Sequence, residues 1–152
     1  MRTEEFVMRG KTPSGKQEVL NFSGLKPGYA YRLVEFQIYP SKSIGTTNYE
    51  LAATLTAAKT FEDPENPDFS NQGLIGTINV IGSDIISGRP YQGPLVVIND
   101  TFLITQNLII AVIDTQAGVP MDVNWQCKFM PVKMSNAEAA VTNYKQFLIS
   151  DN

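Results

Sequence analysis

The feature that most constrains the fold is a strict alternation of apolar and polar side chains near the C-terminus. Met121, Val123, Trp125, Cys127 and Phe129 alternate with the polar residues between them. Because successive side chains of a β-strand point to opposite faces, this period of two predicts a strand with one buried and one solvated face. Trp125 should therefore be largely buried, on the same face as Cys127 and Phe129.

Further segments along the chain have strand composition. Val, Ile and Thr supply 36 of the 152 residues, and β-branched side chains suit a pleated sheet better than a helix. For one segment, 49–56, a helix is the competing interpretation, because alanines recur from Ala52 to Ala58. The segments expected to be strands are 5–9, 16–22, 29–39, 49–56, 74–81, 95–99 and 102–114.

Two of these strands depart from simple alternation. In 29–39 the apolar parity changes after Leu33, which predicts a bulge near that residue or a strand covered on both sides. The uninterrupted apolar run 108–113 predicts a central strand buried on both faces.

The segment Gly10–Gln17 comes within one residue of a phosphate-binding loop. It has both glycines and Lys16, but Gln17 stands where a Ser or Thr should hold magnesium. That loop also needs a following helix, whereas 18–22 has strand character. We therefore expect a hairpin turn between 5–9 and 16–22, with no nucleotide bound.

One helix is expected, near the C-terminus. Ser135 and Glu138 form a capping box, and apolar residues recur from Ala137 to Leu148 at helical spacing. The helix should span about 136–148.

These elements indicate one all-β domain over residues 1–152. No internal repeat and no Ser/Gly linker divides the chain. About eight or nine strands with short turns, followed by the C-terminal helix, predict an antiparallel β-sandwich of jelly-roll or related type.

Charge argues against a direct nucleic-acid binder. The formal net charge is −3, the pI is about 4.9, and no run of Lys or Arg occurs. The basic footprint of nucleic-acid binding is thus missing.

Histidine is absent, which excludes His-based triads and the metal cluster that a jelly-roll metal enzyme would need. The single cysteine, Cys127, allows no intrachain disulfide and is expected in the core rather than as a reactive thiol. We expect no enzymatic activity and no cofactor.

An acidic segment between two predicted strands is the one candidate metal site. Phe61–Gln72 contains two prolines and reads as a long loop. Its carboxylates, Glu62, Asp63, Glu65 and Asp68, supply oxygen ligands that a calcium ion prefers. Their spacing lacks the regular pattern of a calcium loop, so a solvated acidic loop is the favoured interpretation.

Tyrosines are the candidate interface residues, because Tyr is enriched at interfaces. The same side chains can stack on sugar rings or fill sheet faces. The candidates are Tyr29, Tyr31, Tyr39, Tyr49 and Tyr91.

The N-terminus has no apolar region of signal-peptide length. The longest apolar run, Leu108–Ile113, is far shorter than a membrane-spanning helix. We expect neither secretion nor a membrane location.

Four segments, 6–11, 28–33, 99–102 and 143–147, resemble those of small virion proteins encoded by marine bacterial viruses. The resemblance implies a capsid, cement or decoration protein of a bacteriophage, with a β-sandwich fold and no active site. Its partners would be copies of itself and other virion proteins, and it would reside in the virion after assembly in the host cytoplasm. The alternative is a carbohydrate- or receptor-binding sandwich of the same virion.

Overall fold

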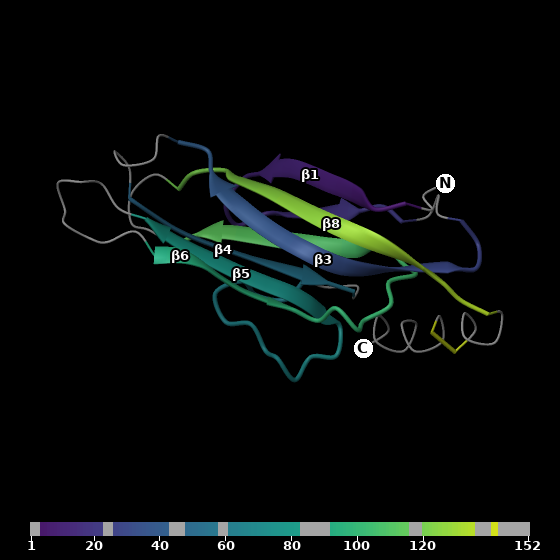
Figure 1. The fold of residues 1–152 in the computed structure, drawn as a ribbon. Coiled ribbons are helices and arrows are strands. Elements are labelled where there is room, and N and C mark those ends of the chain that lie inside the picture. Colours follow the sequence, from purple (N-terminus) through teal and green to yellow (C-terminus); the bar gives the residue numbers. More distant parts are fainter. Residues whose placement is uncertain are drawn as a thin grey trace.

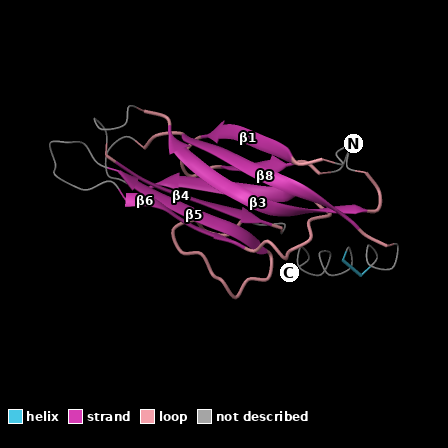
Figure 2. Cartoon of the chain, in the orientation of Figure 1, coloured by secondary structure: helices cyan, strands magenta, loops and turns pink. Residues whose placement is uncertain are grey.

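The computed structural model describes residues 4–22, 26–42, 48–57, 61–82, 92–115, 120–135 and 141–142. In these residues the chain forms eight strands, all paired antiparallel, in two facing sheets (Figures 1 and 2). The predicted all-β sandwich is confirmed. The strands are β1 (Phe6–Thr12), β2 (Gln17–Leu20), β3 (Tyr29–Pro40), β4 (Tyr49–Thr56), β5 (Leu74–Gly82), β6 (Gln92–Ile98), β7 (Leu108–Asp114) and β8 (Val123–Lys133).

The strands pair from the two ends of the chain inward. Strand β1 pairs with β8, β2 with β7 and β4 with β5, which is the nested pairing of a jelly roll. Strand β6 departs from this nesting, because it pairs with β5 rather than with β3. One sheet therefore has three strands, β1-β8-β3, and the other has five, β2-β7-β4-β5-β6.

The core lies between the sheets and is rich in aromatic rings. The ring of Phe6 meets that of Tyr31 edge to face at 5.3 Å, and Phe22 meets Phe129 in the same way at 5.0 Å. Edge-to-face contacts of this kind stabilise a core beyond the area they bury. The alternation of β8 is confirmed, since Val123, Trp125, Cys127 and Phe129 are all buried.

The bulge predicted near Leu33 is confirmed. Leu33 pairs with Phe129 and Glu35 with Lys128, so Val34 is the extra residue on β3. The extra residue changes the parity of the strand. Leu33 and Phe36 therefore both face the core despite their odd spacing.

The predicted hairpin between 5–9 and 16–22 is wrong. Strands β1 and β2 belong to different sheets, and the turn between them crosses from one layer to the other. In that turn the Gly15 amide donates to the Val112 carbonyl of β7 at 2.9 Å. Crossing lets Phe6 of β1 and Leu20 of β2 face one core from opposite sides, which a two-stranded hairpin would not achieve.

The strand predicted over 102–114 is shorter than expected. Strand β7 begins at Leu108, and before it Ile104 forms an isolated bridge to Tyr31. The Asn107 side chain accepts a hydrogen bond from the Phe22 amide at 2.6 Å. These contacts tie the segment to β3 and to the end of β2 in place of a longer ladder.

The segment 49–56 forms strand β4, as predicted in preference to a helix. Its outer face, as well as its core face, is partly buried. Thr54 and Thr56 point away from the core and are nevertheless fully buried. The loop 61–72 covers them: Thr54 Oγ1 donates to the Glu62 carbonyl at 2.6 Å, and the Glu62 amide donates to Thr56 Oγ1. The outer face of β7 is partly exposed at Ile109 and Ile113, so burial on both faces is incomplete there.

The predicted C-terminal helix falls mostly outside the described residues. Of the range 136–148, the structure describes 141–142, whose backbone is helical.

Candidate interaction surface

Among the described residues, three consecutive exposed apolar side chains lie at one sheet edge. Leu95, Val96 and Val97 are consecutive on β6 and are 58%, 44% and 52% exposed. Strand β6 is the last strand of the five-stranded sheet, so its side away from β5, called here its open side, pairs with no other described strand. We call these three residues, together with Phe69, the apolar edge.

Strand β6 has partly exposed apolar side chains on both of its faces. Val96 pairs with Ile78 and so lies on the same face of the sheet. Ile78 is only 2% exposed, because the three-stranded sheet covers it. Val96, one strand further out on β6, is 44% exposed.

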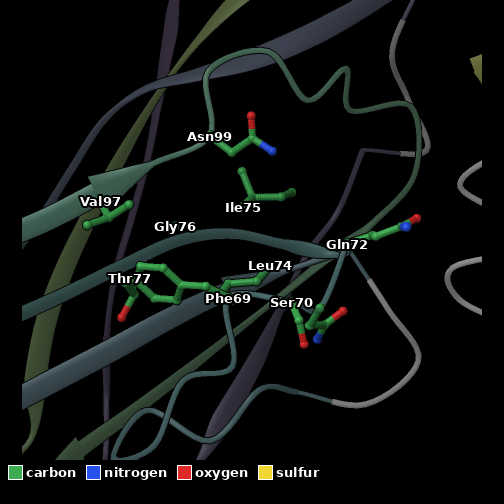
Figure 3. Close-up of a pocket in the computed structure, with 10 residues that line it drawn as sticks. Phe69, Ser70, Gln72, Leu74, Ile75, Gly76, Thr77, Val97 and Asn99 are labelled. Atoms are coloured by element: carbon green, nitrogen blue, oxygen red, sulfur yellow. The ribbon is translucent and has the colours of Figure 1, made fainter.

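Phe69 extends the apolar edge on the outer face of the sheet. It is 62% exposed and lines a shallow pocket of about 200 Å³ together with Val97 and Thr77 (Figure 3). The pocket lies between the loop 61–72 and strands β5 and β6. Phe69 and Val97 thus belong to one continuous surface.

The other three sheet edges carry charges. Strand β1 has Arg9 and Lys11, β2 has Glu18, and β3 has Arg32 and Glu35. Charged side chains at an edge discourage pairing with another chain. Strand β6, with the sequence QGPLVVI, has none.

A second, polar surface lies on the outer face of the three-stranded sheet. In register across the three strands, Arg9 and Gln37 flank Gln126, and Lys11 and Tyr39 flank Asn124. Arg9 donates a hydrogen bond to the Gln126 side chain. Residues of both rows line a shallow groove of about 550 Å³, in which the Tyr39 ring is 57% exposed.

The candidate tyrosines do not form one surface. Tyr31 and Tyr49 are buried in the core, which removes them as interface residues, because their rings fill space between the sheets. Tyr29 is half-buried, with the Lys26 ammonium 5.1 Å from its ring centre. Tyr39 is exposed, and Tyr91 lies outside the described residues.

The acidic loop uses its carboxylates as hydrogen-bond acceptors within the loop. Glu62 accepts from the Asp68 amide at 3.0 Å and from Asn71 Nδ2 at 2.6 Å. Asp63 accepts from the Glu65 amide, and Asp68 accepts from the amide and hydroxyl of Ser70. These bonds to Ser70 lower the pKa of Asp68.

No described group of three or more Asp, Glu or Cys side chains is placed to hold a metal ion. Glu62, Asp63, Glu65 and Asp68 all belong to the described loop, and their carboxylates are not gathered at one point. Three of the four carboxylates, those of Glu62, Asp63 and Asp68, accept hydrogen bonds within the loop.

The segment Gly10–Gln17 lacks the framework of a phosphate loop. It begins in β1, crosses between the sheets and enters β2 without a helix. The Lys16 amide donates to the Pro13 carbonyl at 3.1 Å, and the Val112 amide donates to the Lys16 carbonyl. The Lys16 amide, which a phosphate loop would turn toward the phosphate, is thus hydrogen-bonded within the turn.

Cys127 is fully buried, as expected, and burial raises the pKa of its thiol. No described helix is long and apolar enough to cross a membrane.

The apolar edge was missed by sequence reasoning, which placed a strand at 95–99 but did not identify it as an edge. The available signal was the run Leu95–Ile98 without any charge between Gln92 and Asn99.

No protein-family model matches this sequence, and comparison with curated proteins finds no match.

Proposed function

We propose that the chain is a non-enzymatic virion structural protein that builds or decorates a bacteriophage capsid through protein–protein contacts. The single observation that supports the assembly role best is the apolar edge. Exposed apolar patches rimmed by polar residues are typical of interaction sites.

The fold is compatible with this role. Jelly rolls build viral capsid and lectin domains as well as cupins, although a fold alone does not determine function. Metal-dependent cupin chemistry lacks its ligands here, because the chain has no histidine. The resemblance of four segments to virion proteins of marine bacterial viruses favours the capsid role among these.

Mass spectrometry of purified virions from the virus that encodes this sequence tests the proposal. The chain should be present at a copy number fixed relative to the main shell protein. Its absence from virions would contradict the proposed function.

The polar surface around Tyr39 favours a second candidate function, carbohydrate or receptor binding by the same virion. An exposed tyrosine ring can stack on a sugar, and the neighbouring Gln37, Asn124 and Gln126 amides can hydrogen-bond its hydroxyls. A glycan array tests this alternative. Binding that is lost in Tyr39→Ala but kept in Val97→Lys would favour it, because the two residues lie on different sheets.

A further inference from the structure

We propose that a second copy of this chain pairs with the first through β6, antiparallel, so that two five-stranded sheets become one continuous sheet. The inference rests on the proposed assembly function and names its partner. It depends on the direction of the β6 backbone groups, on Pro94 and on the side chains of Val96, Val97 and Ile98.

The register of β6 turns its backbone hydrogen-bonding groups away from β5 at alternate residues. The Asn99 amide donates to the Ile75 carbonyl at 2.8 Å, in continuous register with the pairs Ile98–Gly76 and Val97–Thr77. In an antiparallel ladder, bonded and non-bonded pairs alternate. The amides and carbonyls of Leu95 and Val97 therefore face β5, and those of Val96 and Ile98 face the open side.

Pro94 limits how another strand can add. The β5–β6 register shifts at this point, because Asn79 pairs with Leu95 but Ile81 pairs with Gln92, so residues 93–94 form a bulge on β6. Whichever way its nitrogen faces, Pro94 has no N–H to donate to an added strand. A copy of β6 that places Val96 opposite Ile98 of the second copy uses both amides and both carbonyls of each strand. A register shifted by two residues places Ile98 opposite Pro94, which leaves the Ile98 carbonyl without a donor.

The favoured register also matches side chains. It places Val97 of the two copies directly opposite each other, at the centre of the pairing, on the outer face that carries Phe69. On the inner face it pairs Val96 with Ile98 of the second copy. Apolar pairs directly opposite in a ladder stabilise a sheet.

Charge favours a second copy at this edge. Two-fold pairing places the residue on the axis opposite its own equivalent, and every other residue i opposite a residue j of the second copy. A charged residue on the axis would therefore face a like charge and destabilise the pairing. Strand β6 carries no charge, unlike β1, β2 and β3. The uncharged edge is therefore also the one that exposes three consecutive apolar side chains.

A cysteine at position 97 tests the register. Residues opposite in a non-bonded pair have Cα atoms about 4.5 Å apart, which is within the range a disulfide spans. Val97→Cys should give a covalent dimer when oxidised glutathione takes up the two thiol electrons, while buried Cys127 stays out of the reaction. The matched control is Val19→Cys on β2, which is 64% exposed.

Dimers from Val97→Cys but not from Val19→Cys support the pairing. Equal yields from the two variants, or no dimer from either, would overturn it.

Opposite charges at the same position test whether the partner is a copy. Val97→Lys and Val97→Glu should each weaken self-association by about tenfold or more, because like charges then face each other. Mixing the two variants should restore association. If the mixture stays as weak as each variant alone, the two-fold pairing is wrong, provided that circular dichroism shows both variants folded.

The two proposals fail in different ways. Failure of the cross-link in a chain found in virions would overturn the β6 pairing and leave the structural role standing. A dimer cross-linked at position 97 in a chain absent from virions would support the β6 pairing and overturn the proposed virion role.

Discussion

The indole ring of Trp125 lies against Gly10 of the neighbouring strand. The two residues are paired in the β1–β8 ladder, and a Cβ atom added at Gly10 would lie 2.7 Å from Cζ2 of the ring. The missing side chain of Gly10 therefore makes the space in which the only tryptophan of the chain packs.

Replacing Gly10 by alanine should destabilise the fold. The ring must move to accept the methyl group, and overpacking of this kind costs about 1 to 3 kcal/mol. Chemical denaturation measures the free energy of unfolding, with the exposed neighbour Lys11→Ala as the control. A Gly10→Ala protein as stable as the control would show that the ring shifts without loss.

Trp125 itself should contribute strongly to stability. Its side chain is buried, and its Nε1 donates to Thr12 Oγ1 at 2.9 Å. Trp125→Ala should lower the free energy of unfolding by about 3 to 5 kcal/mol. Trp125→Phe should cost less than Trp125→Ala, because it keeps an aromatic ring in the core. It should still destabilise the fold, because the buried Thr12 hydroxyl loses the Nε1 donor.

Fluorescence of the unaltered protein checks the same placement without a substitution. The emission should be that of an apolar environment and should shift to longer wavelength on unfolding. A water-like emission in the folded state would contradict the burial of Trp125.

Cys127 should be unreactive in the folded protein. The thiolate is the reactive form, and burial both shields the sulfur and raises its pKa above the ordinary 9.0. A thiol reagent should label Cys127 only after unfolding, whereas the cysteine of Val19→Cys should react at once. Fast labelling of Cys127 in the native chain would refute this.

The same thiol makes stability depend on pH. Above about pH 9 the unfolded chain loses the Cys127 proton and the folded chain keeps it, so the free energy of unfolding should fall as pH rises. Cys127→Ala removes this contribution. The stability difference between the two proteins should therefore change above pH 9 and be constant below it.

Glu62 should hold the loop 61–72 in place over β4. Glu62→Ala removes the acceptor for Asp68 and Asn71, and we expect a loss of about 1 kcal/mol for this half-buried group. Hydrogen exchange should rise in the loop, and Glu65→Ala is the matched control. Added calcium should not shift the melting temperature; a calcium-dependent rise that Glu62→Ala abolishes would identify a metal site instead.

Local patterns predicted the strands but not their partners. Alternation placed Trp125 in the core, and the parity change placed the bulge at Leu33, because both depend on neighbouring residues. The crossing between β1 and β2 depends on partners about 100 residues away, such as Val112 for Gly15. No local pattern carries that information.

The candidate surfaces show the same division. Whether a tyrosine such as Tyr31 or Tyr39 is buried depends on which face its strand turns to the core, and the bulge alters that face. The apolar edge could be predicted as a strand, but its exposure follows from β6 pairing with β5 rather than with β3. The partner of β6 in the sheet, which the residue types of the strand do not reveal, decides its position at the edge.

The mass of the full chain in solution tests the central claim most directly. Sedimentation at micromolar concentration should show species heavier than the 16.8 kDa monomer, and Val97→Lys should shift them toward the monomer. A single 16.8 kDa species at every concentration, unchanged by Val97→Lys, would contradict an assembly role for the apolar edge.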